Sequence, residues 1–299
     1  MPELPEVEVV RRGLAEHITG ATFVGTEVLH PRAVRGQEGG AAALEAGLAD
    51  ARIVAVRRRG KYLWMELERP GGVGGPGRCL LIHLGMSGQM LLGEPGQVTS
   101  PHLRIRSLLV TDADGDPGRE LELSFVDQRT FGRWELTVPG VTDPVPHIAL
   151  DPLDPAFDAG TTARLIRRKR SEIKRVLLDQ TVVSGIGNIY ADEALWVAQV
   201  HPRKKASAMR QGDVVDLLHA AAGVMTRALA AGGTSFDDLY VNVNGASGYF
   251  SRSLNAYGRE GEPCPRCGTA IVREHWTNRS SHLCPECQRP PRTVRPPLS

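Results

Sequence analysis

The stretch CPRCGTAIVREHWTNRSSHLCPEC, residues 264–287, holds four of the five cysteines of this 299-residue chain. Cys264 and Cys267 form one Cys-x2-Cys pair, and Cys284 and Cys287 form a second pair after 16 intervening residues. Two such pairs supply the four thiolates of a tetrahedral zinc site, so the spacing predicts one structural Zn2+ rather than disulfides. Because four protein ligands leave no open position for a substrate, we do not expect this zinc to be catalytic.

The segment between the two cysteine pairs predicts two strands joined by a turn that carries Asn278 and Arg279. We therefore expect a C-terminal zinc-finger β-hairpin over residues 250–289, and a proline-rich basic tail over 290–299 that is disordered. A zinc-stapled hairpin with a basic tip is typical of nucleic-acid binding, although many zinc ribbons only bind protein or fill space.

Upstream of the zinc finger, the pattern changes twice. Residues 150–240 contain TARLIRRKRSEIKRVLLD, NIYADEALWVAQV and DVVDLLHAAAGVMTRALAAGG, whose spacing of apolar residues predicts a helical module. A Pro/Asp-rich connection separates it from residues 1–140, where short runs rich in β-forming residues predict an antiparallel sandwich or barrel. An amphipathic helix over 3–18 precedes these runs. The expected fold class is α+β with several domains.

Charge is distributed unevenly along the chain, although its formal net charge is only +2. Residues 1–150 hold 16 basic against 19 acidic side chains, whereas residues 151–299 hold 20 against 15. This asymmetry favours a polyanionic partner. No apolar run approaches roughly 18 residues, and the amino terminus lacks the pattern of a signal peptide. We therefore expect a cytoplasmic protein with no membrane partner.

The amino terminus, Met1-Pro2-Glu3, is a candidate reaction centre. Removal of methionine before the small proline leaves a secondary α-amine as a potential nucleophile. An α-amine with a pKa of about 7.7–8.0 is roughly 10% neutral at pH 7, against about 0.04% for lysine. Glu3 and Glu6 lie on one helical face beside this amine, which fits general acid and base work. Alternatively, Pro2 simply starts the helix and the acids complement its dipole.

In the β module, Lys61 follows three arginines and a glycine in RRRGKYL, and Met86 lies in the glycine-flanked turn of HLGMSGQM. A methionine in such a turn is ordinarily a core residue. Arg129 and Phe131 are two residues apart at the end of the strand in FVDQRTFG, so both side chains should point the same way. An exposed arginine and phenylalanine on one side suggest a wedge between stacked bases.

In the helical module, GIGNIYADE places two glycines just before a helix start. Free backbone N–H groups and Asn188 could bind a phosphate there. The upstream run RRKRSEIKR supplies further basic residues, among them Arg170 and Lys174. For most of these charges a solvated helix face is the plain alternative.

Together, these segments resemble the formamidopyrimidine-DNA glycosylase family, also called 8-oxoguanine DNA glycosylase, from Pro2 to about Cys287. MPELPEVE, GKYL, HLGMSG, GIGNIYADE, GGTSFDDLY with GYF, YGREGEPC and the four-cysteine ribbon occur in the family's order. The resemblance implies an N-terminal helix with an antiparallel β-sandwich, a helix-two-turn-helix domain and a C-terminal zinc finger. Its implied partner is double-stranded DNA that contains damaged bases, and we expect a monomer.

The resemblance also implies a reaction, in which the enzyme flips an oxidised purine out of the duplex and Pro2 attacks C1′ of its sugar. Glu3 would protonate the ring oxygen, and β- and δ-elimination would cut the strand. Lys61 would assist base removal, and Arg279 would grip the phosphates at the lesion. The side chains that fill the vacated space are Met86, Arg129 and Phe131, with Arg129 bonded to the orphaned cytosine. The matches to phosphate contacts are Asn188, Arg170, Lys174 and His102.

Two departures from the family pattern concern base preference. The frequent DPRRFG is DQRTFG here, so Thr130 replaces an arginine, and the loop VNVNGASGYF has no basic residue. An endonuclease VIII-like enzyme for oxidised pyrimidines is the closest alternative, but that branch usually begins MPEGPE and lacks the Arg–Phe wedge. A second alternative is a protein without catalytic activity that binds damaged DNA or acts as a zinc-ribbon binding protein. The intact Pro2, Glu3 and Lys61 argue against this alternative.

Overall fold

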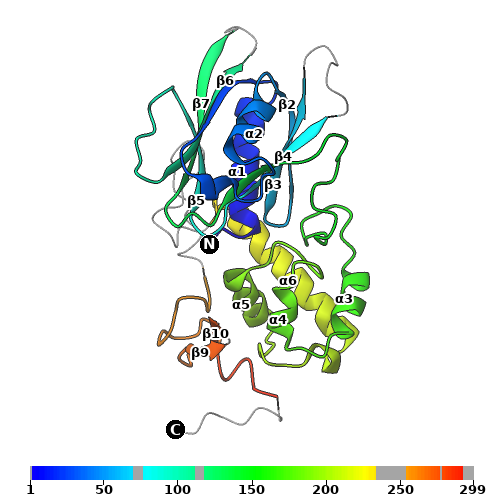
Figure 1. Cartoon of the computed structure of the whole chain (residues 1–299). Coiled ribbons are helices and arrows are strands. Elements are labelled where there is room, and N and C mark those ends of the chain that lie inside the picture. Colours follow the sequence, from blue (N-terminus) through cyan, green and yellow to red (C-terminus); the bar gives the residue numbers. More distant parts are fainter. Residues whose placement is uncertain (1, 70–76, 112–117, 234–253, 277, 292–299) are drawn as a thin grey trace. The chain divides into compact units, whose positions relative to one another are not determined.

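The computed structural model describes residues 2–69, 77–111, 118–233, 254–276 and 278–291 (Figure 1). The chain divides into two compact units, one formed by residues 1–146 and 231–249 and the other by residues 147–230 and 250–299. Within the described ranges, no helix combines the length and the apolar character needed to cross a bilayer. The expected disordered tail and the loop VNVNGASGYF lie outside the described residues, apart from the first two residues of the tail.

The first unit begins with helix α1 (Leu4–Ile18) and contains a 3-10 helix η1 (Pro31–Val34) and a helix α2 (Gly40–Leu48). Its described strands are β1 (Thr22–Val28), β2 (Arg52–Arg59), β3 (Tyr62–Glu68), β4 (Arg78–His83), β5 (Gly88–Gly93), β6 (Leu103–Thr111), β7 (Arg119–Asp127) and β8 (Arg133–Leu136). They pair in the order β5-β7-β6-β1-β2-β3-β4-β8, and neighbouring strands are antiparallel.

The eight-stranded sheet is creased between β1 and β2. A single register pair, Thr22 with Arg52, joins these two strands in the described chain, whereas β6 and β7 share eight pairs. The two four-stranded halves therefore turn toward each other, and one apolar core contains side chains from both. The rings of Phe125 and Trp134, one from each half, lie 6.0 Å apart between centroids. This arrangement confirms the predicted antiparallel β-sandwich.

Helix α1 buries the apolar face that the sequence pattern predicts. Val7, Val10, Leu14 and Ile18 are at most 1% exposed and belong to the same core as the sandwich. Burying four such side chains contributes on the order of 1.5–3 kcal/mol each, an upper estimate. The start of this helix is thereby fixed to the body of the first unit.

Helix α2 is not predicted by the sequence pattern above. It is rich in Ala and Gly and follows Gly39, whose φ is +76°. Two leucines four residues apart, Leu44 and Leu48, are fully buried and hold it against the core. A short helix with so few apolar positions gives a weak periodic signal, because only packing against the sandwich stabilises it.

The second unit contains helices α3 (Ala159–Arg167), α4 (Ile173–Leu177), α5 (Asn188–Val197) and α6 (Gln211–Ala230), with a 3-10 helix η3 (Ala206–Ala208). The long helix α6, yellow in Figure 1, packs against α3 and α5. The predicted helical segment 162–179 is interrupted between α3 and α4, where Glu172 forms an isolated β-bridge with Lys205. This interruption changes which side chains face solvent after it.

The cysteine segment forms the predicted hairpin. Strands β9 (Val272–Trp276) and β10 (Arg279–Leu283) are antiparallel, with Arg279 opposite Trp276 and Leu283 opposite Val272. Arg279 is therefore the first residue of β10, at the turn, and it is exposed. The two Cys-x2-Cys turns flank this hairpin at its other end.

Candidate active site and zinc site

Two buried carboxylates lie at the start of α1. Glu3 and Glu6 are 1% and 2% exposed, and Pro2 beside them is buried. The main-chain N–H of Glu3 donates to Glu6 Oε2 at 2.9 Å, as part of a capping box in which each side chain bonds the other residue's backbone. Both carboxylates thus belong to the four residues that follow Pro2 in the chain.

A third carboxylate at the start of α1, that of Glu8, connects this helix to the turn that carries Lys61. Glu8 accepts bonds from Arg11 Nε at 2.9 Å and from Arg58 Nε at 3.0 Å. Burial raises the pKa of Glu8, but the hydrogen bonds and charges of Arg11 and Arg58 outweigh it and lower the pKa to about 2. Arg58 Nη1 also donates to the carbonyl of Gly60 at 3.0 Å. This bond fixes the residue immediately before Lys61.

Lys61 is the second residue of a two-residue turn between β2 and β3, because Arg59 pairs with Tyr62. Gly60, the first residue of the turn, has a φ of +56°, a left-handed value that favours glycine. Lys61 is half-buried and its charge contributes to lowering the pKa of His83, although burial of that imidazole is the largest cause. The result is a pKa of about 4 for His83, which keeps it neutral near pH 7.

The turns that carry Met86 and the pair Arg129 and Phe131 lie side by side. The Arg129 N–H donates to Ser87 Oγ at 3.0 Å, which joins the two turns directly. The Arg129 guanidinium lies 5.2 Å from the centroid of the Phe131 ring, and that ring is 39% exposed. Met86 is half-buried.

Arg129 and Phe131 do share one side, but the reason given by strand periodicity is wrong. Strand β7 ends at Asp127, and Thr130 between the two side chains has a φ of +53°. A bend therefore brings the two side chains together. His102, half-buried near this bend, accepts a bond from the Asp127 N–H through its main-chain oxygen at 2.9 Å.

Lys174, predicted to contact phosphate, is buried inside the second unit, and this prediction is wrong. Its side chain is 0% exposed, and Nζ lies 2.6 Å from Asp192 Oδ1. Nζ also donates to the Ser280 carbonyl at 3.0 Å and to Ser281 Oγ at 3.1 Å. Because the helix is interrupted before α4, Lys174 faces inward instead of continuing the solvated face of α3.

The buried pair of Lys174 and Asp192 should contribute strongly to stability. We expect Lys174→Met, which leaves the Asp192 carboxylate buried without its cation, to lower the free energy of unfolding by about 3–5 kcal/mol. Urea unfolding of the zinc-loaded protein measures this. The double variant Lys174→Met/Asp192→Asn removes both charges and should recover much of the loss.

The exposed pair of Lys169 and Asp179 provides a matched control. These side chains are 47% and 37% exposed and lie 3.6 Å apart. Lys169→Met should change the free energy of unfolding by less than about 1 kcal/mol. Equal losses for Lys169→Met and Lys174→Met would contradict the structural role of the buried pair.

Asn188 and Lys174 bond the same carbonyl in the zinc hairpin. Asn188 Nδ2 donates to the Ser280 oxygen at 3.1 Å, and its own Oδ1 is buried without a partner among the described residues. Asp192 accepts bonds from Ser281 Oγ at 3.0 Å and from the His282 N–H at 2.9 Å. The three residues that follow Arg279 are therefore anchored to α4 and α5. Arg170 lies exposed in the interruption between α3 and α4.

The four cysteines of the zinc finger come together as the spacing predicts. Their Sγ atoms all lie within 4.8 Å of one another, and Cys267 Sγ is 3.5 Å from both Cys284 Sγ and Cys287 Sγ. Tetrahedral zinc with bonds of about 2.3 Å places sulfur atoms about 3.8 Å apart, so this donor set fits the metal. The Trp196 indole N–H donates to Cys264 Sγ at 3.4 Å and supports its thiolate.

Four thiols at these distances cannot all ionise without a positive charge between them. Burial raises the pKa of Cys264, but hydrogen bonds from the Arg266 backbone and from Trp196 lower it to about 6. Burial and the bond to Cys267 raise the pKa of Cys284 to about 12. A divalent cation at the centre favours the thiolate form of all four, as expected for a structural zinc site.

Three known protein domains together match most of the chain. Residues 1–134 match the Formamidopyrimidine-DNA glycosylase N-terminal domain, residues 148–239 its H2TH domain, and residues 261–290 the zinc finger found in FPG and IleRS. The formamidopyrimidine-DNA glycosylase of Mycolicibacterium smegmatis is 59% identical over 301 residues, which cover 99% of this chain and 100% of that protein. The chain belongs to the formamidopyrimidine-DNA glycosylase family.

Solved structures of formamidopyrimidine-DNA glycosylases have the same fold. A variant of the Lactococcus lactis enzyme in complex with Fapy-dG-containing DNA aligns with a TM-score of 0.83 at 32% identity, over 97% of this chain and 100% of that chain. MutM in complex with carbocyclic 8-oxo-G-containing DNA aligns with a TM-score of 0.82 at 33% identity, with the same coverage. The resemblance inferred from the motifs is thus confirmed, and the zinc-finger match with the cysteine cluster shows one structural zinc.

The sequence patterns did not identify several residues that hold the turns and the zinc hairpin of this glycosylase in place. Asp127 and Ser87 join the turn that carries Met86 to the bend that carries Arg129 and Phe131, and Asp192 anchors the zinc hairpin. Glu193 accepts main-chain bonds from Asn255, Ala256 and Tyr257 at 2.8 to 3.1 Å, which fixes the segment that leads into the zinc finger. All four are buried polar side chains. The sequence feature that could have identified these four residues is their position within the motifs DQRTFG, HLGMSG and ADE.

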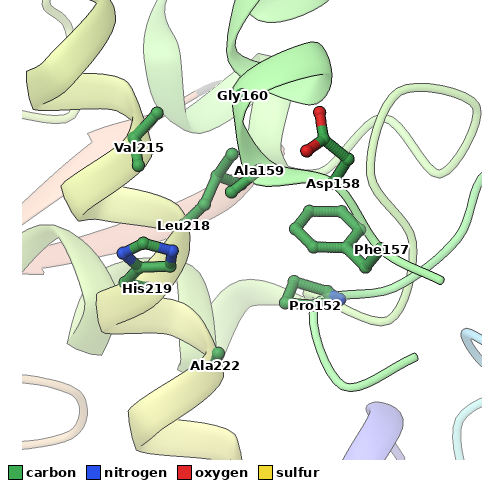
Figure 2. Close-up of a pocket in the computed structure, with 9 residues that line it drawn as sticks. All are labelled: Pro152, Phe157, Asp158, Ala159, Gly160, Val215, Leu218, His219 and Ala222. Atoms are coloured by element: carbon green, nitrogen blue, oxygen red, sulfur yellow. The ribbon is translucent and has the colours of Figure 1, made fainter. Parts of the chain in front are cut away.

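A cavity of about 420 Å3 in the second unit is lined by none of the residues predicted to act in the glycosylase reaction. Figure 2 shows its lining, which combines Pro152 and residues 157–160 with one face of α6. Phe157 and Leu218 give it an apolar wall, and His219 lies at its edge.

Proposed function

We propose that this DNA glycosylase removes oxidised purines, 8-oxoguanine and formamidopyrimidines, from duplex DNA and then cuts the strand as an AP lyase. The DNA ligands of the related Lactococcus lactis enzyme and of MutM support this substrate class. We further propose that it acts as a monomer in the cytoplasm.

The observation that carries the proposal is the buried start of α1. Pro2 is adjacent to two carboxylates that are nearly inaccessible to solvent and are fixed by reciprocal backbone bonds. A helix start needs no such buried acidic pair for capping alone, since exposed Asp or Glu serves there. Acid and base groups held in a dry environment beside a nucleophile fit covalent catalysis.

In the proposed reaction, Met1 is removed and the Pro2 nitrogen attacks C1′ of a flipped nucleotide. The bond between C1′ and the base breaks, the base leaves with the electron pair, and the proton that the Pro2 nitrogen loses neutralises the departing base. Glu3 protonates the ring oxygen as the C1′–O4′ bond opens, which gives an iminium between Pro2 and C1′. Loss of a C2′ proton expels the 3′ phosphate, and a second elimination expels the 5′ phosphate.

Other side chains have proposed supporting roles. Glu6 holds the Glu3 backbone and contributes to proton transfer, and Lys61 assists base removal. Arg279 grips the phosphates at the lesion. Met86, Arg129 and Phe131 fill the vacated space, with Arg129 bonded to the opposite cytosine. Further phosphate contacts are assigned to Arg170, Asn188 and His102, and Lys174 is no longer among them.

Comparison of two lesions tests the proposed substrate. We expect single-turnover excision of 8-oxoguanine opposite cytosine to be roughly tenfold or more faster than excision of thymine glycol, because the proposed substrate is an oxidised purine and thymine glycol is an oxidised pyrimidine. Quenched-flow cleavage of labelled duplexes measures both rates. Faster excision of thymine glycol would favour the endonuclease VIII-like alternative, and binding without cleavage of either duplex would favour a silent damage-binding protein.

A further inference from the structure

Asp127 is a fully buried carboxylate at the point where β7 ends, and both of its oxygens are used. Oδ1 accepts bonds from Ser87 Oγ at 2.6 Å and from the Arg129 N–H at 3.2 Å. Oδ2 accepts a bond from the Gly132 N–H at 2.7 Å. The side chain is 0% exposed, so water does not compete for these bonds. One carboxylate therefore reaches the residue after Met86 and both ends of the Arg129–Phe131 bend.

The two turns that Asp127 joins also touch through their backbones. A Cβ on Gly85 would lie 2.4 Å from Gly132 N, and a Cβ on Gly132 would lie 2.9 Å from the His83 carbonyl. Neither position has room for a side chain, so the turns form one close-packed unit. Movement of either turn must then displace the other.

The bend itself is held in a strained conformation. Thr130 is β-branched, yet its φ is +53°, a left-handed value that such residues seldom adopt. Arg35 clamps the far side of the bend, with Nη2 donating to the Phe131 carbonyl at 2.7 Å and Nη1 to the Gly132 carbonyl at 2.8 Å. A strained bend persists only where surrounding bonds fix it, and Asp127 and Arg35 provide them.

We propose that Asp127 is a positioning residue for recognition of the opposite strand. Its carboxylate sets Met86, Arg129 and Phe131 in one fixed geometry, so that Arg129 meets cytosine and rejects adenine. The inference rests on the proposed function, in which these three side chains fill the vacated space. Asp127 itself touches neither the lesion nor the reacting atoms.

Asp127→Asn is the most direct test, because it preserves shape and removes one acceptor. An amide has only one oxygen, so its NH2 group must face either the Gly132 N–H or the Ser87 hydroxyl and Arg129 N–H. A donor facing the Gly132 N–H leaves that buried group unsatisfied. The bend should then relax, and Arg129 should lose its fixed position.

The measurement is the ratio of single-turnover excision rates for 8-oxoguanine opposite cytosine and opposite adenine. We expect Asp127→Asn to lower this ratio by about tenfold, equal to the loss of one oriented bond to the opposite base. Borohydride trapping on an abasic duplex should persist in the variant, because Pro2, Glu3 and Glu6 are unaltered. A fold defect alone would lower the two excision rates and the trapping yield together.

Glu122→Gln is the matched control, since Glu122 is a buried carboxylate of the same strand. Its oxygens accept bonds from the Gly96 N–H at 3.1 Å and Ser124 Oγ at 2.8 Å, and neither donor belongs to the two turns that Asp127 joins. Its cytosine-to-adenine ratio should match that of the unaltered protein. If Asp127→Asn fails to fold, Ser87→Ala removes only the shared hydroxyl and should lower the ratio in the same direction.

Three results separate this inference from the proposed function. An unchanged ratio in folded Asp127→Asn or Ser87→Ala, with normal excision by the unaltered protein, overturns the positioning role and leaves the glycosylase function intact. Absence of excision and of trapping in the unaltered protein overturns the function itself. Equal rates opposite cytosine and adenine in the unaltered protein overturn the recognition role of Arg129 and the inference with it.

Discussion

Converting the Pro2 nitrogen into a peptide amide should abolish covalent trapping and base excision. An N-terminal extension of several residues does this without changing any side chain. An amide nitrogen has no available lone pair, so neither attack on C1′ nor iminium formation is possible. We expect the excision rate to fall by roughly 10^4-fold or more, the scale seen when a covalent nucleophile is removed. Borohydride trapping on an 8-oxoguanine·C duplex and single-turnover cleavage measure the two losses.

The same extension placed at the C-terminus is the control and should leave trapping intact. Pro2→Gly complements it, because glycine restores a free amine without the secondary ring nitrogen and should weaken excision. Glu3→Gln keeps the nucleophile and removes the proposed proton donor. A trapped adduct of normal yield in the extended protein would show that another amine, with Lys61 the first candidate, is the nucleophile.

Loss of one cysteine of the cluster should abolish zinc binding and weaken DNA binding. Cys284 is 0% exposed and packs with Trp196 and Ile271 in a small core of the zinc finger. Cys284→Ala leaves three ligands in a module whose folding depends on metal binding of about 10 kcal/mol or more. We expect zinc content to fall from about one equivalent to near zero. Binding to an abasic-analogue duplex should weaken at least a hundredfold, because Arg279 loses its support.

Cys79→Ala is a control within the same chain. Cys79 is buried in β4, and its Sγ bonds the Val141 carbonyl at 3.3 Å, outside the cluster. Burial raises the pKa of this thiol to about 11, so it is not a reactive thiolate near pH 7. Its replacement should leave zinc content and DNA affinity unchanged. Tight DNA binding by zinc-free Cys284→Ala would show that the finger is dispensable.

Periodic and local patterns allowed most of the fold to be predicted. The apolar spacing of Val7, Val10, Leu14 and Ile18 predicts the buried face of α1, and the two Cys-x2-Cys pairs predict the zinc cluster. Such features depend on neighbours a few residues apart, so the sequence displays them directly. The crease between β1 and β2 depends on long-range pairing and has no local signature.

The roles of buried polar residues were the part of the site that the sequence predicted least well. Lys174 lies within a run of basic residues that is typical of a solvent-exposed helix face. Only the interruption before α4 turns its side chain toward Asp192. Asp127 was overlooked because nothing near it in sequence shows that its carboxylate reaches both Ser87 and Gly132. Hydrogen bonds between distant segments decide such roles, and a hydrophobic pattern does not encode them.

The position of the proposed nucleophile has a consequence for conformational entropy. A lysine side chain loses about 2 kcal/mol of rotamer freedom when its amine is held in place. The Pro2 nitrogen is part of the backbone, has no rotatable side-chain bonds, and is attached to a helix whose first turn is packed into the sandwich core. Its orientation is therefore set during folding, before any DNA is bound. Substitutions that loosen the core beneath Val7 and Val10 should act on the reaction rate as well as on stability.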